Sequence, residues 1–180
     1  MENNDFKAIK DRLIKGNLAF RGTPYANLDT NEELRAYLTN NGQHPYAIVF
    51  ACSDSRVNPE AIFSAGLGEL FVVRSAGQAL LDGEFSSIAY AVNHLHAPYV
   101  LVLGHTCCGA VGSVLAGAKE KELQPLLDYV ETAIAGLTDP RKAEEKSARY
   151  TANLIQERLP HAHVESAIYD IASGEVRFLD

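Results

Sequence analysis

Residues 99–112 read YVLVLGHTCCGAVG, so a continuous apolar run ends abruptly in a glycine, a histidine and two adjacent cysteines. Runs of the same kind occur at residues 46–52 (YAIVFAC) and 69–74 (ELFVVR). Continuous rather than alternating apolarity is typical of strands that are covered on both faces, as in a parallel sheet. The three segments therefore predict buried parallel strands with polar residues at their carboxyl ends.

Helical patterns lie between and after these strands. Helical spacing of apolar residues marks the following segments: 84–96, a stretch beginning at 109, 122–137, and a last helix ending near 158. Two β-rich segments at 163–171 and 175–179 then close the chain as a hairpin. Strands that alternate with helices predict one α/β domain over residues 1–180, with a mostly parallel central sheet flanked by helices.

Residues 1–40 precede the first strand and are expected to form a helical arm. Residues 5–20 place apolar side chains at near-helical intervals, with fraying expected near Gly16. Thr30, followed three residues later by Glu33, forms a capping-box pattern that predicts the start of a second, short helix. Because too little chain precedes the first strand to build a core of its own, we expect this arm to dock on a second subunit.

The composition limits the classes of partner. The formal net charge is -7, which disfavours nucleic acids and anionic membrane surfaces as partners. No apolar run approaches the roughly 20 residues that a membrane span needs, and the polar, acidic N-terminus is unlike a signal peptide. Three cysteines argue against a disulfide framework and for metal binding or catalysis. We therefore expect a cytoplasmic protein.

The cysteines and one histidine suggest a metal site. Cys52 and His105 each end a predicted strand, and ligands bind at the carboxyl ends of strands in open parallel sheets. If a helix starts near His105, Cys108 at i+3 shares its face, whereas Cys107 points away. One imidazole and two thiolates suit zinc, so Cys52, His105 and Cys108 are the candidate ligands. We expect Cys107 to lie in the core or to support the ligands without binding the metal.

Asp54 and Arg56 follow the first candidate ligand in the motif CSDSR at residues 52–56. As a surface ion pair they would contribute little to stability. Their position beside Cys52 favours a catalytic role instead, in which a bidentate guanidinium holds the carboxylate ready to accept a proton, or keeps it off the metal.

At these residues the sequence resembles the β-class carbonic anhydrases. The resemblance extends from about Gln43 to Ala116 and rests on motifs in a matching order and spacing: CSDSR (52–56), ELFVVRSAG (69–77), SSIAYAV (86–92) and GHTCCGAV (104–111). It implies that Cys52, His105 and Cys108 are the zinc ligands.

The resemblance also implies the roles of residues around the metal. Asp54 and Arg56 would form the catalytic dyad, and Gly109 would line the site. Gln43 would point at the substrate, and the aromatic residues Phe71 and Tyr90 would wall its pocket. In the family these wall positions are contributed across a dimer interface, which implies a homodimer or a dimer of dimers.

The function that the resemblance implies is the zinc-dependent, reversible hydration of carbon dioxide to bicarbonate and a proton. Three protein ligands leave a fourth tetrahedral position for water, and zinc lowers the pKa of that water towards about 7. Similar proteins that hydrolyse carbonyl sulfide or carbon disulfide use the same ligands, so the choice of substrate stays open. The sequence is also compatible with a closed zinc site that has Asp54 or Cys107 as fourth ligand, and with a redox pair formed by Cys107 and Cys108.

Overall fold

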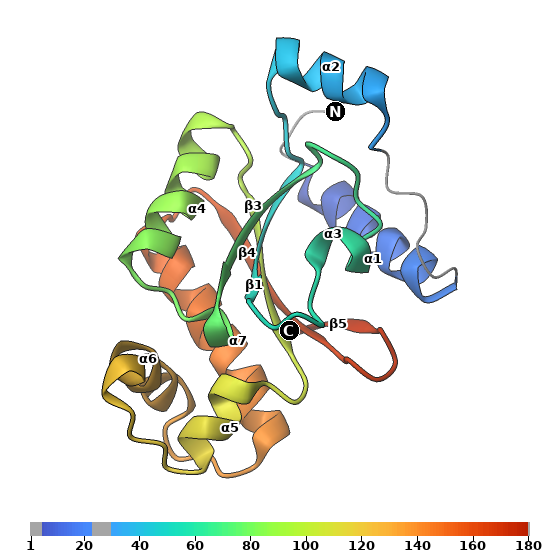
Figure 1. The fold of residues 1–180 in the computed structure, drawn as a ribbon. Coiled ribbons are helices and arrows are strands. Elements are labelled where there is room, and N and C mark those ends of the chain that lie inside the picture. The colour runs from blue at the N-terminus through green and yellow to red at the C-terminus, as the bar shows by residue number, and fades with distance from the viewer. Residues whose placement is uncertain (1–4, 23–29, 180) are drawn as a thin grey trace.

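The computed structural model describes residues 5–22 and 30–179 and contains a sheet of five strands in the order β2-β1-β3-β4-β5 (Figure 1). The strands are β1 (Ala47–Cys52), β2 (Leu70–Ser75), β3 (Tyr99–His105), β4 (His163–Tyr169) and β5 (Val176–Leu179). The first four are parallel, and β5 runs antiparallel to β4. The predicted α/β fold, with its mostly parallel sheet and C-terminal hairpin, is confirmed.

Helices cover both faces of the sheet. They are α1 (Phe6–Gly22), α2 (Glu32–Asn41), α3 (Pro59–Ile62), α4 (Asp82–His94), α5 (Gly109–Leu115), α6 (Gln124–Ile134) and α7 (Pro140–Arg158), with single 3-10 turns at Ala76–Gln78 and Lys121–Leu123. Figure 1 shows α1 and α3 on one face and α4 and α7 on the other, while α5 and α6 lie beyond one end of the sheet. This two-sided cover explains the continuous apolar strands, because every residue of β1 and β3 is buried.

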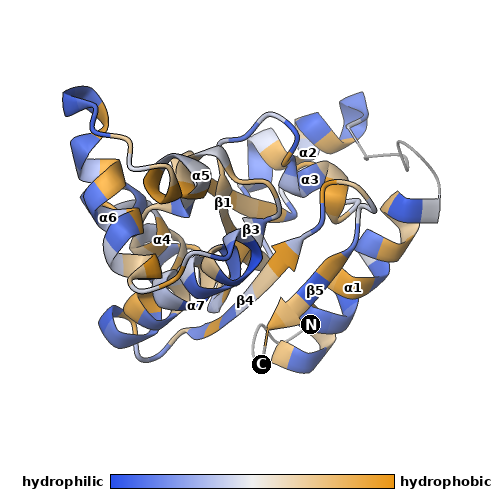
Figure 2. Ribbon diagram, turned by 90° about the horizontal axis from the view of Figure 1, so that it is seen from below, coloured by the Kyte–Doolittle hydropathy of each residue, from blue (hydrophilic) through white to orange (hydrophobic). Residues whose placement is uncertain are grey.

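Two hydrophobic cores lie on opposite faces of the sheet. One joins Ile48, Phe50 and Val102 to α4 and α7, and the other joins Val49 and Leu101 to α1 and α3. Figure 2 shows the hydrophobic stretches of the sheet enclosed by helices with mixed or hydrophilic surfaces. The alternating direction of strand side chains therefore supplies both cores from the same two strands.

The first helix packs on its own chain. Ile9 and Leu13 are buried in the α1 and α3 core, and α1 continues unbroken through Gly16, so the expected fraying there is wrong. Gly16 lies directly against the backbone of Phe63, and an ideal Cβ at position 16 would be 1.9 Å from the Phe63 carbonyl oxygen. The apolar face of α1 thus completes a core that it shares with the sheet, and docking of this helix on a second subunit stays a prediction.

The second helix is attached differently. Its N-cap is Asn31, whose side chain accepts a hydrogen bond from the Leu34 amide at 2.7 Å, so the predicted cap at Thr30 is wrong by one residue. None of the described residues of α2 is buried, and Tyr37 is 58% exposed. Docking on a second subunit thus stays a prediction for α2. The remaining parts of the predicted arm, residues 1–4 and 23–29, lie outside the described residues.

No helix among the residues that the structure describes is both long enough and apolar enough to cross a membrane.

Candidate metal centre

Cys52, His105 and Cys108 come together at the carboxyl ends of β1 and β3. One ligand atom from each side chain lies within 4.8 Å of the other two, and all three residues are buried. The two strands pair in parallel, so their ends lie at the same edge of the sheet. The structure thus brings together the three side chains that the sequence places at two strand ends.

The connection from His105 to Cys108 is a tight turn, not the start of a helix. His105 ends β3, Cys107 adopts a left-handed conformation with φ 59°, and Cys108 is the N-cap of α5. The prediction that His105 and Cys108 lie together therefore agrees with the structure, but the helix on which that prediction relied does not start at His105. Cys107 is exposed, so its expected place in the core is wrong, and its carbonyl oxygen accepts a hydrogen bond from Arg56 Nη2 at 3.2 Å.

The tautomer of His105 follows from its hydrogen bond. Its Nδ1 lies 2.9 Å from the backbone carbonyl oxygen of Thr106, which can only accept, so Nδ1 carries the hydrogen. In the neutral ring the lone pair is then on Nε2, which is buried and has no hydrogen-bond partner among the described residues. A buried acceptor without a donor fits a ligand position for a cation.

The two thiols cannot both ionise without a cation nearby. The hydrogen bond from Cys108 lowers the pKa of Cys52, and the backbone amides of Asp54 and Gly77 lower it further. The same contact with Cys52, together with burial, raises the pKa of Cys108. A divalent cation would remove this conflict, because it attracts both thiolates and the lone pair of His105. The donor set therefore fits zinc.

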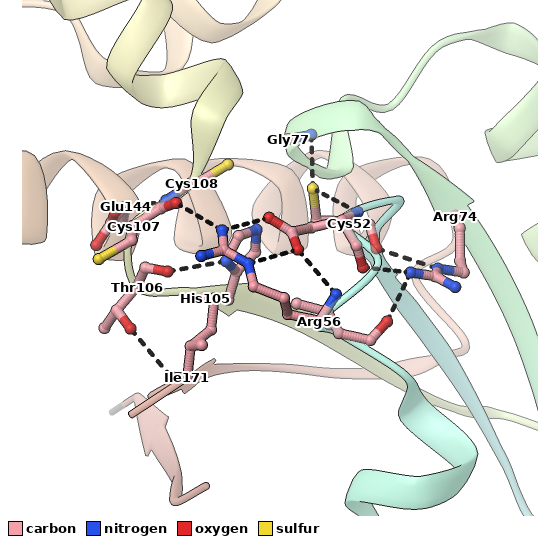
Figure 3. Close-up of polar contacts among 12 residues, drawn as sticks. Cys52, Arg56, Arg74, Gly77, His105, Thr106, Cys107, Cys108, Glu144 and Ile171 are labelled. Carbon is pink, nitrogen blue, oxygen red and sulfur yellow. Dashed lines mark hydrogen bonds and ion pairs between the residues drawn. The ribbon is translucent and has the colours of Figure 1, made fainter. Parts of the chain in front are cut away.

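Backbone amides surround the sulfur of Cys52 (Figure 3). The Gly77 amide donates to Sγ at 3.2 Å and the Asp54 amide at 3.4 Å. Gly77 lies in the 3-10 turn Ala76–Gln78 and has φ 61°, and a Cβ there would be 2.8 Å from the Cβ of Ala110. A glycine is thus required both by the backbone conformation and by the close approach of α5.

Asp54 and Arg56 form a bidentate pair beside the cluster. Arg56 Nε donates to Asp54 Oδ1 at 2.9 Å and Nη2 donates to Oδ2 at 2.7 Å, while the Arg56 amide also donates to Oδ1 at 2.9 Å. These bonds hold the pKa of Asp54 well below its usual range. The carboxylate is therefore ionised at neutral pH, and its orientation is fixed by the planar fork of the guanidinium.

Two supporting residues have roles that the sequence pattern does not predict, although Arg74 ends the second apolar run and lies in the motif ELFVVRSAG. Arg74 donates to the carbonyl oxygens of Cys52 at 3.1 Å, Asp54 at 2.7 Å and Val57 at 2.6 Å, and so fixes the loop that carries the dyad. Glu144 on α7 accepts a hydrogen bond from the Cys108 amide at 3.0 Å. Both act on backbone atoms, so the spacing of side-chain types in the sequence gives no sign of them.

The expected substrate residues are only partly near the cluster. Gly109 follows Cys108, begins α5 and is exposed. Phe71 and Tyr90 contact each other with ring centroids 6.3 Å apart, but Phe71 pairs with Ile48, roughly 13 Å along β1 from Cys52. Gln43 is exposed before the amino end of β1. A single chain therefore does not bring Gln43, Phe71 and Tyr90 to its own cluster.

Comparisons with known proteins agree with this arrangement. A family model described as carbonic anhydrase matches residues 47–176. A carbonic anhydrase from Mycolicibacterium smegmatis is 41% identical over 140 residues, covering 77% of this chain and 66% of that protein. Carbonic anhydrase 2 from Mycobacterium tuberculosis is 49% identical over 123 residues, covering 68% and 59%. The matched part thus spans less than two thirds of either relative.

Among solved structures, the β-carbonic anhydrase CcaA has a TM-score of 0.70 at 28% sequence identity, covering 96% of this chain and 88% of that chain. The similarity therefore includes the helices before β1 as well as the sheet and the candidate metal centre.

Proposed function

This chain belongs to the β-carbonic anhydrase family, and from that premise we propose that it is a zinc enzyme that hydrates carbon dioxide reversibly to bicarbonate and a proton. The observation that carries the proposal is the buried group of Cys52, His105 and Cys108, with ligand atoms within 4.8 Å of one another. These three residues would hold the zinc. When bound, zinc supplies Lewis acidity that lowers the pKa of a coordinated water molecule towards about 7.

Asp54 would act as the hydrogen-bond acceptor for the attacking water. Its Oδ2 accepts one described hydrogen bond, from Arg56 Nη2, and so keeps a lone pair for a water molecule. Arg56 holds the carboxylate through two side-chain donors, which engage both oxygens of Asp54. The dyad would therefore orient the water while leaving the fourth coordination position open.

This geometry supports an open zinc site over a closed one and over a redox pair. A closed zinc site needs Asp54 or Cys107 as fourth ligand, but Asp54 is paired with Arg56 and Cys107 is exposed. A redox pair needs two accessible sulfurs, whereas Cys108 is only 5% exposed. Hydrolysis of carbonyl sulfide or carbon disulfide would use the same open site and is distinguished by assay.

The substrate wall would require a second copy of the chain. We infer that Gln43, Phe71 and Tyr90 serve the site of a neighbouring subunit, because they lie far from the cluster of their own chain. The edge strand β2, which carries Phe71, and the unburied helix α2 offer the surfaces for a homodimer or a dimer of dimers. A cytoplasmic location is proposed on the three free cysteines.

The first experiment measures zinc content and carbon dioxide hydration on the full chain. We expect one zinc per chain, hydration in stopped flow, and little turnover of carbonyl sulfide in parallel. Cys108→Ser should lose the metal, and Cys107→Ser should retain it because the Cys107 side chain is exposed. Equal zinc loss in the two variants would overturn the ligand assignment. A reaction with carbonyl sulfide that is faster than the hydration of carbon dioxide would overturn the proposed substrate.

The second experiment tests the dyad. Arg56→Ala should keep zinc but lose most hydration activity, because the freed Asp54 can turn towards the cation. Arg56→Lys should rescue poorly, since an ammonium group cannot form the two-donor fork. The measurement is the hydration rate against pH with zinc quantified in each sample. A wild-type rate and pH profile in Arg56→Ala with full zinc would show that Arg56 does not control Asp54.

A further inference from the structure

A buried carboxylate that the proposed reaction does not use lies behind the metal centre. Glu144 on α7 is 4% exposed, and its Oε1 accepts a hydrogen bond from the Cys108 amide at 3.0 Å. Burial raises the pKa of this carboxyl group, and the nearby amides of Cys108 and Cys107 oppose that rise. Glu144 thus binds the Cys108 amide in the turn that carries one candidate ligand, and no described hydrogen bond joins it to Asp54 or Arg56.

The turn itself has an unfavourable conformation. Cys107 has φ 59°, which is the left-handed region that residues with a Cβ rarely adopt. The Cys107 carbonyl oxygen accepts from Arg56 Nη2 at 3.2 Å and the Cys108 amide donates to Glu144, so both polar groups of the peptide bond between Cys107 and Cys108 are held (Figure 3). Such a backbone conformation persists only where the surrounding structure fixes it.

Glu144 is well placed to fix this turn because α7 packs tightly on β3 at this point. An ideal Cβ on Gly104 would lie 3.1 Å from the Cβ of Ala148 and 3.6 Å from the carbonyl oxygen of Glu144. The backbone of α7 therefore lies close to β3 beside Glu144, and Gly104 permits this close approach. Because the group is buried, water does not replace a hydrogen bond that is lost.

We propose that Glu144 is a positioning residue, whose carboxylate holds the Cys107–Cys108 turn in its left-handed conformation and so keeps Cys108 Sγ beside Cys52 and His105. The inference rests on the proposed zinc site. It does not give Glu144 a part in the reaction, because the hydrogen bond described for its carboxylate comes from a backbone amide. Its loss should therefore weaken retention of the metal before it changes the chemistry.

The test compares Glu144→Gln with Glu145→Gln, which removes a neighbouring charge on the same helix. Glu145 is partly exposed and pairs with Arg177, and no described contact joins it to the turn. The measurement is the rate at which a chromogenic chelator removes zinc from each full-length protein. We expect Glu144→Gln to release zinc about 10–100-fold faster, because the Cys108 amide then donates to a neutral and weaker acceptor in place of a carboxylate. Glu145→Gln should stay within about twofold of the wild-type rate.

A second variant separates positioning from general stability. Cys107→Gly removes the Cβ that makes the left-handed conformation unfavourable, so it should slow zinc release much more in the Glu144→Gln background than in wild type. If Glu144→Gln alone does not fold, the double variant should fold and bind zinc; a double variant that stays unfolded refutes the inference. Circular dichroism confirms the folded state of each protein.

The outcomes also separate this inference from the proposed function. If wild type takes up no zinc, both are wrong. If wild type holds one zinc and both glutamine variants release it at the same rate, only the role of Glu144 is wrong. Equal effects of Cys107→Gly in the two backgrounds would likewise refute it, because the carboxylate and the turn would then act independently.

Discussion

Gly16→Ala should destabilise the protein, although the same change inside a helix is ordinarily favourable. Alanine gains about 1 kcal/mol over glycine in a helix interior. At this position the new Cβ would be 1.9 Å from the Phe63 carbonyl oxygen and 2.7 Å from the Phe63 carbonyl carbon. These are backbone atoms, so the contact cannot be relieved by rotating a side chain, and α1 must move away from α3.

The size of the effect follows from what such a movement breaks. Overpacking of a tight contact costs about 1–3 kcal/mol. Moving α1 also strains Asn17, which donates to the carbonyl oxygens of Ile62 at 3.2 Å and Gly174 at 2.9 Å and accepts from the Val176 amide at 3.0 Å. Weakening these buried bonds adds about 1–2 kcal/mol. After subtracting the helix gain, we expect a net loss of about 1–4 kcal/mol.

The assay is urea unfolding followed by circular dichroism, at one protein concentration so that assembly contributes equally. The matched control is Gly22→Ala at the end of the same helix, where nothing lies within 4 Å of the ideal Cβ. It should be neutral or slightly stabilising. For a chain of this size the Gly16→Ala loss corresponds to a Tm lower by about 2–16 °C. A Gly16→Ala protein as stable as the Gly22→Ala control would refute the close packing of α1 on α3.

Three further changes test other parts of the molecule. Burial raises the pKa of Glu165, but hydrogen bonds from Tyr99 and Lys10 outweigh it and hold the pKa below its usual value of 4.5. Glu165 therefore stabilises the fold above about pH 4.5 and loses this contribution as the pH falls through its lowered pKa. In Glu165→Gln, the unfolding free energy should fall less steeply between about pH 5 and pH 3 than in the wild type. The same slope in both proteins would contradict this. Gly104→Ala should lose about 1–3 kcal/mol in urea unfolding, because its Cβ would lie 2.8 Å from Ile168 Cδ1, and a neutral result would contradict the tight packing there. Tyr37→Ser on α2 should weaken subunit association in sedimentation velocity without lowering the stability of the subunit, whereas an unchanged assembly would place the interface elsewhere.

The sheet could be predicted from the sequence because strands that are buried on both faces appear as continuous apolar runs. Every residue of β1 is buried, so the chain has no polar position to interrupt the apolar run. The short helix α3 gives no such pattern, since its four residues, Pro59–Ile62, are too few to show a period. Gly16 was misjudged for a related reason. From sequence propensity, glycine is expected to disrupt a helix. At position 16 the missing side chain instead lets α1 contact the backbone of Phe63, which only the folded structure brings near.

The candidate site, like the fold, could be predicted from the sequence only in part. Cys52, His105 and Cys108 could be grouped in advance, because the carboxyl ends of parallel strands meet at one edge of the sheet. The turn at Cys107 could not, because its left-handed conformation is imposed by contacts from distant segments. Arg74 and Glu144 escape sequence reasoning because each binds backbone atoms, which every residue type possesses.

The placement of the three candidate ligands at the ends of two strands also has a consequence for the order of events during folding. Cys52 ends β1, while His105 and Cys108 follow β3, and the whole of β2 and α4 lies between them in the chain. Parallel pairing of β1 with β3 is a long-range contact that forms only after this intervening chain has closed into a loop. In a chain emerging from the ribosome, the three-residue pocket therefore cannot be complete until residue 108 has been synthesised and the two strands have paired. Binding of a metal ion by the complete pocket would then cross-link β1 to β3 and resist the separation of the two strands. Metal binding would therefore be a late step that stabilises the sheet after it has formed.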